Sequence, residues 1–213
     1  MKNKSNKKVG RYFWYDFVKV TGFVPAYIWL RPKIVRESDN VPKRIKGGVL
    51  IASNHVTYID PIILHLAFPH RRLHSIATKD IARTKLRRFF FKTANCIFID
   101  KQNFSMASLR EICDHLKEEK AVVIFPESSV AEQNVVRDYK SGVVLMSLLS
   151  KKPILPVCII RGKTKFSRVK VVIGEPIDVA AMYGSMPSME QMEMVSKMLQ
   201  QKEQELLEKY QNK

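Results

Sequence analysis

Cysteine is scarce in this sequence, and the few cysteines present are far apart. Cys96, Cys113 and Cys158 form no Cys-x-x-Cys pair. This spacing predicts neither a zinc site nor a disulfide framework, and it favours a reducing compartment. Cys96 and Cys158 lie in apolar runs, where a small buried hydrophobe is the favoured interpretation over a nucleophile.

Acidic residues are also few. The 213 residues contain 37 Lys and Arg against 20 Asp and Glu, which gives a formal charge of +17. Such a charge favours anionic partners, whether nucleic acid, an acidic membrane surface or a phosphate-bearing substrate. The chain shows no RNP aromatic motif, zinc finger or GXXG loop, so we expect no nucleic-acid partner. With 46% hydrophobic and 27% charged residues, the composition is typical of one globular core.

A long uninterrupted apolar run is missing as well. The apolar stretch 12–30 contains Asp16, Lys19 and Pro25 and no small-residue cleavage site, so we expect neither a signal peptide nor a clean transmembrane span. Basic residues precede an aromatic run, which predicts that segment 1–30 is an interfacial helix on an anionic membrane surface. A helix packed on its own domain is the alternative. The expected location is the cytoplasmic face of the cell membrane, peripheral or monotopic.

The remaining chain is organised as a linker and one domain. Residues 31–48 combine prolines, glycines and charges and are predicted to be a linker into a domain spanning 49–213. Short apolar runs predict strands at 49–53, 73–77, 95–99, 121–125, 154–160 and 169–173. Helices are predicted at 61–68, 105–119, 142–149 and 188–210, with Asp60 as the N-cap of the first. Alternating helices and doubly apolar strands are typical of a layered α/β domain with a largely parallel or mixed sheet.

A candidate catalytic pair lies where the first of these strands meets the first helix, a position where catalytic groups collect in α/β sheets. His55 and Asp60 are separated by four residues, so the loop can fold the carboxylate back onto the imidazole. Asp60 would then fix the tautomer of His55 and stabilise the imidazolium formed when His55 takes a proton. The alternative is that Asp60 only caps the helix and that His55 is an ordinary loop histidine.

Further motifs follow this pair in order. They are Ile97-Phe98-Ile99-Asp100-Lys101, Phe125-Pro126-Glu127-Ser128-Ser129, Tyr139-Lys140-Ser141-Gly142 and Ile154-Leu155-Pro156-Val157. Together with the Asn-His-x4-Asp-Pro block, they resemble the glycerophospholipid acyltransferase family over about 49–177. The resemblance implies that His55 deprotonates an acceptor hydroxyl, which attacks the thioester of acyl-CoA or acyl-carrier protein, with Asp60 in support. It implies no metal and no cofactor beyond the donor substrate.

The resemblance also implies a set of substrate-binding residues: Asn54, Lys101, Glu127, Ser128, Ser129 and Lys140. Ser128 and Val130 replace the family's usual glycine and arginine, which removes a guanidinium suited to phosphate. Lys101 and Lys140 are left to bind a phosphate as point charges. The expected acceptor is lysophosphatidate or a similar lysolipid in phospholipid biosynthesis. The alternatives are another acceptor, such as a lyso-aminolipid, and a non-catalytic basic module that binds membranes or nucleic acid.

A second basic cluster surrounds the aromatic run 89–91. It consists of Lys79, Arg83, Lys85, Arg87, Arg88 and Lys92. Membrane docking beside the entrance for the acyl chain is the favoured interpretation, and a solvated basic face over a buried aromatic core is the alternative. The other histidines, His65, His70, His74 and His115, show no spacing typical of a metal site.

Overall fold

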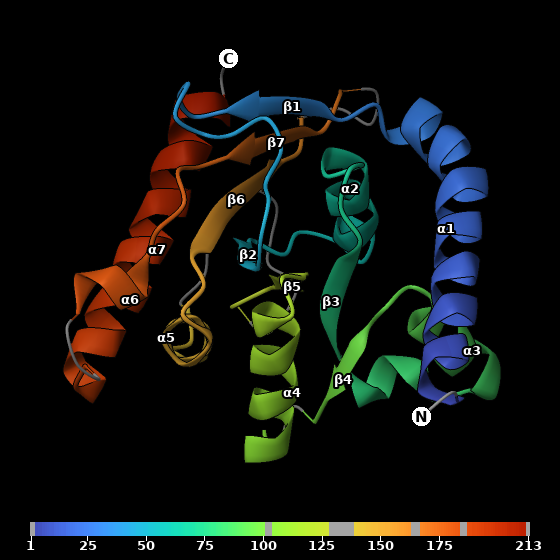
Figure 1. Ribbon diagram of the computed structural model, residues 1–213. Coiled ribbons are helices and arrows are strands. Elements are labelled where there is room, and N and C mark those ends of the chain that lie inside the picture. The colour runs from blue at the N-terminus through green and yellow to red at the C-terminus, as the bar shows by residue number, and fades with distance from the viewer. Residues whose placement is uncertain (1–2, 101–103, 128–138, 163–166, 184–186, 212–213) are drawn as a thin grey trace.

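The computed structural model describes residues 3–100, 104–127, 139–162, 167–183 and 187–211. Within these residues, strands and helices alternate along most of the chain, except that β1 is followed by β2, β6 by β7 and α6 by α7 (Figure 1). The strands are β1 (Lys33–Arg36), β2 (Val49–Ser53), β3 (Leu73–Thr78), β4 (Ile97–Ile99), β5 (Ala121–Ile124), β6 (Ile154–Ile160) and β7 (Lys170–Ile173). The helices are α1 (Asn3–Leu30), α2 (Asp60–Ala67), α3 (Lys85–Thr93), α4 (Met106–Lys117), α5 (Gly142–Ser150), α6 (Val179–Met182) and α7 (Met189–Gln211). A short 3₁₀ helix, η1 (Lys79–Ala82), precedes α3.

All described strands belong to one sheet, in the order β1-β7-β6-β2-β5-β3-β4. Neighbours from β6 to β4 pair in parallel, as do β1 and β7, whereas β6 and β7 are antiparallel. The prediction of an α/β fold with a mixed, largely parallel sheet is therefore confirmed. The central strand β2 is buried along its whole length, which explains why a short apolar run was enough to predict its bounds.

Helices cover both faces of the sheet. Because side chains alternate along a strand, Val49 and Ile51 pack on one face and Leu50 and Ala52 on the other. The first face is covered by α2, and the second by α4, α5 and α7. Helices α1 and α7 stand at opposite edges of the molecule, and α3 lies against α1 (Figure 1).

The segment predicted to be a linker, 31–48, is part of the domain instead. Residues Lys33–Arg36 form β1, which pairs with β7 at the edge of the sheet. Val41 and Ile45, farther along the same segment, are buried in the core. The linker prediction is wrong because an edge strand exposes part of both faces, so its sequence lacks the continuous apolar run that marks a central strand.

Helix α1 is fixed to the domain through one side. Tyr15 is buried, and its hydroxyl accepts a hydrogen bond from the backbone amide of Leu73 at 3.2 Å. The carboxylate of Asp16 accepts two hydrogen bonds from Arg72, at 3.0 and 2.6 Å, and Lys19 Nζ donates to two backbone carbonyls before β3. No helix in the described part of the chain is both long enough and apolar enough to span a bilayer.

Candidate active site

His55 lies in the loop between β2 and α2, at the carboxyl end of the central strand. Its Nδ1 is 3.0 Å from Oδ2 of Asp60. Since a carboxylate accepts, Nδ1 is the donor, and Nε2 is then the ring nitrogen that can accept a proton. The imidazole is 18% exposed and the Asp60 side chain is fully buried, so the pair has one open side, at the imidazole.

The Asp60 carboxylate also shapes the loop that carries His55. Its Oδ2 accepts hydrogen bonds from the backbone amides of Val56 and Thr57, each at 2.6 Å, and its Oδ1 accepts one from the Thr57 hydroxyl at 2.8 Å. Asp60 is thus the first residue of α2, with its side chain turned back onto the loop. The prediction that Asp60 is the N-cap is wrong, because the N-cap is Ile59, which makes no side-chain capping bond.

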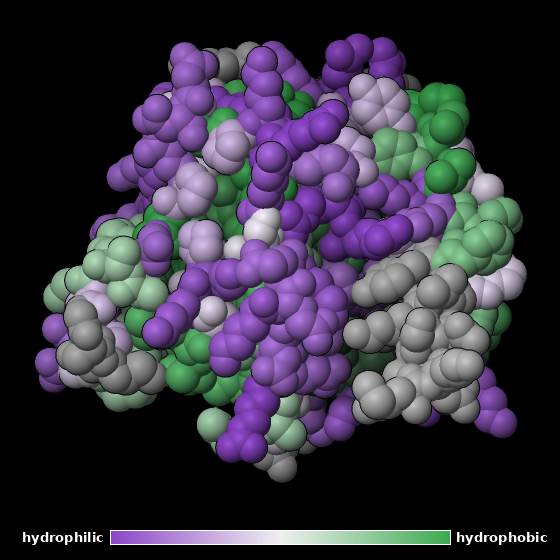
Figure 2. Space-filling model, viewed as in Figure 1, coloured by the Kyte–Doolittle hydropathy of each residue, from purple (hydrophilic) through white to green (hydrophobic). Residues whose placement is uncertain are grey.

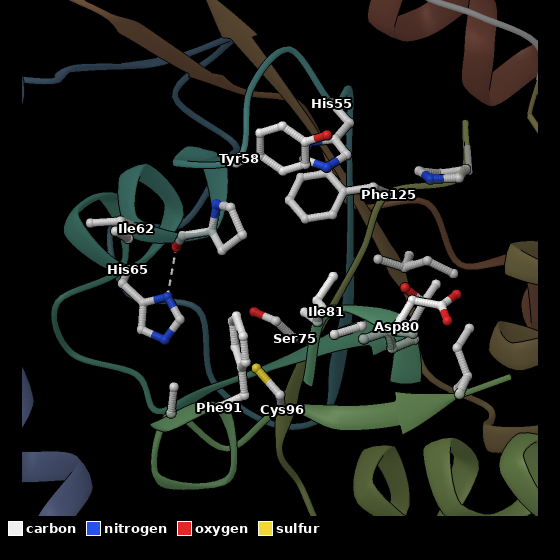
Figure 3. A pocket seen from close by; sticks show the side chains of 18 of the residues that line it. His55, Tyr58, Ile62, His65, Ser75, Asp80, Ile81, Phe91, Cys96 and Phe125 are labelled. Atoms are coloured by element: carbon white, nitrogen blue, oxygen red, sulfur yellow. Dashed lines mark hydrogen bonds between the residues drawn. The ribbon is translucent and has the colours of Figure 1, made fainter. Parts of the chain in front are cut away.

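Phe125, at the end of β5, supports the imidazole from one face. The two rings are stacked, with centroids 4.3 Å apart and an interplanar angle of 23°. Figure 3 shows the two rings lying together. The sequence placed Phe125 in a motif but not in the site. Its position directly after the strand that pairs with β2 is the signal that would have identified it.

Asn54 anchors the loop from behind. Its amide is fully buried and exchanges two hydrogen bonds with the backbone of Ile159 in β6, donating to the carbonyl at 3.0 Å and accepting from the N–H at 2.7 Å. Both ends of the amide are therefore used by β6. The expected contact of Asn54 with substrate is replaced by a role in fixing the start of the loop.

An open cleft of about 2290 Å³ runs past His55. One part is walled by α1, α2, β3 and α3, and its lining is mainly apolar: Val18, Phe23, Ala26, Ile62, Leu66, Ile76, Leu86, Phe89 and Phe91. In Figure 3, His55 and Phe125 lie at one end of the view, and His65, Phe91 and Cys96 at the other. The volume exceeds that of typical small-molecule pockets and suits a long apolar chain beside the imidazole.

Another part of the same cleft is polar. It is lined by Tyr139, Lys140 and Ser141 ahead of α5, and by Glu193, Lys197 and Gln200 on α7. Lys140 was predicted from its motif, and the cleft brings it into the same space as His55. Lys197 was missed, because one lysine among the many of the C-terminal helix carries no local signal. Helical spacing nevertheless puts it on the face shared with Glu193 and Gln200.

The structure describes only some of the other residues that were predicted to bind substrate. Lys101, Ser128, Ser129 and Val130 lie outside the described residues. Glu127 is buried and does not line the cleft, although its neighbour Pro126 does. The Glu127 side chain lies within electrostatic range of Tyr139 and Glu203.

A second histidine, His65, also lines the cleft. Its Nδ1–H donates to the carbonyl of Pro61 at 2.7 Å, and burial lowers its pKa. His65 is therefore a neutral member of the cleft wall. Among the residues that the structure describes, no group of three or more His, Cys, Asp or Glu side chains is arranged to hold a metal ion.

Known proteins resemble this chain in both sequence and fold. A model of the Acyltransferase family matches residues 33–160. The 1-acyl-sn-glycerol-3-phosphate acyltransferase of Bacillus subtilis is 28% identical over 177 residues, which cover 81% of this chain and 86% of that protein. A probable 1-acyl-sn-glycerol-3-phosphate acyltransferase of Mycoplasma pneumoniae is 28% identical over 152 residues, 68% of this chain and 56% of that protein.

A solved structure shares the fold. It is the crystal structure of the 1-acyl-sn-glycerophosphate acyltransferase PlsC from Thermotoga maritima, which superposes with a TM-score of 0.66 at 22% identity. The match covers 100% of this chain and 85% of that one. At this identity the likeness concerns the fold, including a sheet and an N-terminal helix in the same arrangement.

Proposed function

Because the match to the family model spans more than half of the chain, the protein belongs to the acyltransferase family, and we propose that it transfers a fatty acyl group to the hydroxyl of a lysophosphatidate-type lysolipid. The donor is a thioester, acyl-CoA or acyl-carrier protein. The observation that carries the proposal is the His55–Asp60 pair, with Nε2 of His55 as the free nitrogen beside a long apolar cleft.

The reaction needs one base and no protein nucleophile. His55 Nε2 takes the proton of the acceptor hydroxyl while the oxygen attacks the thioester carbonyl, and the carbonyl oxygen becomes an oxyanion. Asp60 stabilises the imidazolium through Nδ1–H. When the tetrahedral intermediate collapses, the C–S bond breaks and the thiolate takes the proton back from Nε2, so that the ester and a free thiol leave.

The apolar and polar parts of the cleft match the apolar and polar parts of such substrates. The apolar part beside α1 and α3 suits an acyl chain, since burying each methylene stabilises binding by about 0.8 kcal/mol. The polar part contains Lys140 and Lys197, which suit a phosphate. A phosphate-bearing acceptor is also what the names of the relatives specify, which supports lysophosphatidate over an uncharged acceptor.

The exposed surface near the apolar part of the cleft supports binding of the protein to a membrane. Along its length, α1 exposes a set of large apolar residues: Phe13, Trp14, Phe17, Val20, Val24, Tyr27, Ile28 and Trp29. Hydrophobic side chains gather along this edge of the molecule in Figure 2. We propose that this face enters an anionic bilayer, at the cytoplasmic face of the cell membrane, so that a lipid acceptor can reach the cleft directly.

Helix α3 extends the same surface. None of its residues is buried, and Leu86, Phe89 and Phe90 are exposed beside Arg87, Arg88 and Lys92. The alternative interpretation of a basic face over a buried aromatic core is therefore wrong. Aromatics at the level of the headgroups, flanked by cations, favour docking on anionic lipid.

A transfer assay with purified protein tests the proposed function. Wild type and His55→Ala are each given acyl-CoA and acyl-carrier protein donors, with lysophosphatidate, a lyso-aminolipid or an uncharged monoacylglycerol as acceptor. We expect transfer to lysophosphatidate by the wild type and a loss of about 100-fold or more in the variant, the usual size of a general-base effect. Folded wild-type protein that transfers to none of the acceptors would refute the proposal, and transfer to the lyso-aminolipid alone would correct the acceptor.

A further inference from the structure

Strand β3 carries small side chains where it borders the cleft. Leu73, Ser75 and Ala77 lie on the same face of the strand, because side chains alternate along it. Leu73 is buried in the core on the face that α2 covers, whereas Ser75 and Ala77 line the apolar part of the cleft. The two small side chains leave space that a lipid chain can fill. Ser75 is thus the residue at which the packed core gives way to the cleft.

The hydroxyl of Ser75 has no hydrogen-bond partner among the residues that the structure describes. Two other polar groups of the cleft wall are paired: His65 Nδ1 donates to the carbonyl of Pro61, and the Tyr15 hydroxyl accepts from the amide of Leu73. Figure 3 shows Ser75 among the side chains that line the cleft. A buried hydroxyl without a partner is costly, and Ser75 is only 4% exposed. Its partner must therefore come from a molecule that enters the cleft.

Ser75 lies close to the reaction site. It pairs with Val123 on β5, and Phe125, two residues farther along the chain, stacks on the imidazole of His55. From the spacing of residues along a strand and of strands in a sheet, the backbones of Ser75 and Phe125 are about 8 Å apart. A substrate in contact with His55 can therefore also reach Ser75.

The group that this hydroxyl requires is a hydrogen-bond acceptor in an otherwise apolar part of a ligand, since an O–H donates one hydrogen bond. A lysolipid carries such an acceptor only a few bonds from its reacting hydroxyl. It is the carbonyl oxygen of the ester that joins the chain to glycerol. A chain that fills the apolar part of the cleft excludes water, so the substrate itself must supply the acceptor.

We propose that Ser75 is a specificity-determining residue whose hydroxyl donates a hydrogen bond to the ester carbonyl of the lysolipid acceptor, so that the protein selects ester-linked over ether-linked lysophosphatidate. The inference rests on the proposed function. An ether-linked acceptor has the same charge, a matching chain and the same reacting hydroxyl, but it lacks the carbonyl oxygen. In the cleft it leaves the Ser75 hydroxyl without a partner, and a site built to bond a polar group discriminates against an analogue that lacks it.

The test compares transfer to 1-acyl- and 1-alkyl-lysophosphatidate of equal chain length by the wild type, Ser75→Ala and Thr93→Val. Ser75→Ala removes only the hydroxyl. Thr93→Val is the matched control, because it removes a hydroxyl of the cleft wall that already donates to the carbonyl of Phe89 at 2.9 Å.

We expect kcat/KM of the wild type and of Thr93→Val to be about five-fold higher for the ester than for the ether, equivalent to ~1 kcal/mol. Ser75→Ala should use both acceptors equally, with the donor KM unchanged. A wild type that does not prefer the ester, or a Ser75→Ala variant that keeps the preference, overturns the inference.

Thermal melts provide a second measurement. Removing a hydroxyl that has no partner in the protein should leave the melting temperature of Ser75→Ala unchanged or raise it. A clear fall, or loss of the folded state, would show that the hydroxyl is bonded within the protein, and it overturns the inference.

Binding separates this inference from the proposed function. If folded wild-type protein transfers to neither acceptor, the proposed function fails, and calorimetric titration of the wild type and Ser75→Ala with the two lysolipids decides the inference. Tighter binding of the ester than of the ether by the wild type, and equal binding by Ser75→Ala, supports it. Equal binding of the two lysolipids by the wild type overturns it.

Discussion

The imidazole of His55 and the ring of Phe125 are stacked, with centroids 4.3 Å apart. Together with the hydrogen bond to Asp60, this contact leaves the imidazole little freedom, because one interaction fixes its edge and the other its face. The proposed base is therefore oriented before substrate binds, which is the arrangement that general-base catalysis requires.

This contact leads to a first prediction. Phe125→Leu keeps an apolar side chain but loses the flat face, so the imidazole gains freedom. We expect kcat to fall about three- to ten-fold, corresponding to ~0.7 to 1.4 kcal/mol. Steady-state kinetics with a thermal melt measures this, and Phe104→Leu, which also changes a phenylalanine in the cleft wall, is the matched control. Equal rates in the Phe125 variant and the wild type would mean that the stacking has no part in catalysis.

Asp60→Asn should damage both activity and stability. The carboxylate of Asp60 accepts from His55 and from the amides of Val56 and Thr57, and an amide NH₂ in its place would face donors. We expect kcat to fall at least about 100-fold, as general-base effects usually do. The free energy of unfolding should fall by about 1 to 3 kcal/mol, the usual effect of an unsatisfied buried group. Denaturant unfolding and transfer rates are measured on the same sample. A variant with full stability and low activity would show that Asp60 serves the base alone.

The exposed face of α1 predicts how the protein binds vesicles. Deleting residues 1–30 would remove Tyr15 and part of the cleft wall, so point changes on the exposed side are the sharper test. Phe13→Ser with Phe17→Ser should sharply reduce flotation with anionic vesicles, because exposed aromatics drive interfacial binding. Met194→Ser, an exposed apolar residue on α7, is the control. Unchanged flotation of the double variant would point to α3 as the docking surface.

Much of the fold could be predicted from the sequence because buried parallel strands are apolar on both faces. The bounds of β2 and β6 agree with the predicted runs, and the others differ by a few residues at the ends. Strand β1 was not predicted because it lies at the edge of the sheet, where its residues are half exposed. The sequence left open whether Asp60 contacts His55 or only caps the helix, and the folded loop shows that its carboxylate contacts the imidazole.

The contact between His55 and Asp60 was predictable for a different reason: both residues lie within one short loop. Phe125 and Lys197 come from distant segments, and they reach the cleft of His55 only through the order of strands and the packing of α7. Glu203, also on α7, lies in a Glu- and Gln-rich stretch, where a solvated helix face is the natural interpretation of the sequence. Its burial follows from the three leucines that share its face of the helix.

Glu203 on α7 is fully buried, and burial raises the pKa of its carboxyl group well above the ordinary value, which has a consequence for stability. Its pKa is raised on folding, so the folded protein holds a proton that the unfolded chain releases above the ordinary pKa of glutamate. Stability from this group is therefore fully present below the unfolded pKa and is lost as pH rises toward the folded pKa, at most about 1.4 kcal/mol per pH unit. Glu203→Gln does not titrate and should become increasingly more stable, relative to the wild type, as the pH rises.

Denaturant unfolding of both proteins at about pH 5 and about pH 8 measures this difference. Tyr139 and Cys158 have pKa values raised well above their ordinary range, so both stay protonated in the folded protein at these two pH values. A stability difference that does not change with pH would show that Glu203 is ionised in the folded protein.

The polar part of the cleft gives the last prediction, which concerns the acceptor. Lys197 lies on the face of α7 that lines the cleft with Lys140, and both are exposed, so they act on a phosphate through partly screened charge. At about 4 Å, two unit charges attract by ~1 to 4 kcal/mol near a protein surface. We therefore expect Lys197→Gln to lower kcat/KM for lysophosphatidate about five-fold or more relative to an uncharged monoacylglycerol. Lys209→Gln, on the same helix and outside the cleft lining, should leave the ratio unchanged.

Raising the salt concentration should weaken the discrimination between the two acceptors by the wild type and reduce the effect of Lys197→Gln, since the Debye length shortens to ~3 Å at 1 M. A ratio that is the same in Lys197→Gln and the wild type at low salt would mean that the phosphate lies elsewhere, and the assignment of the polar part of the cleft to the acceptor headgroup would fail.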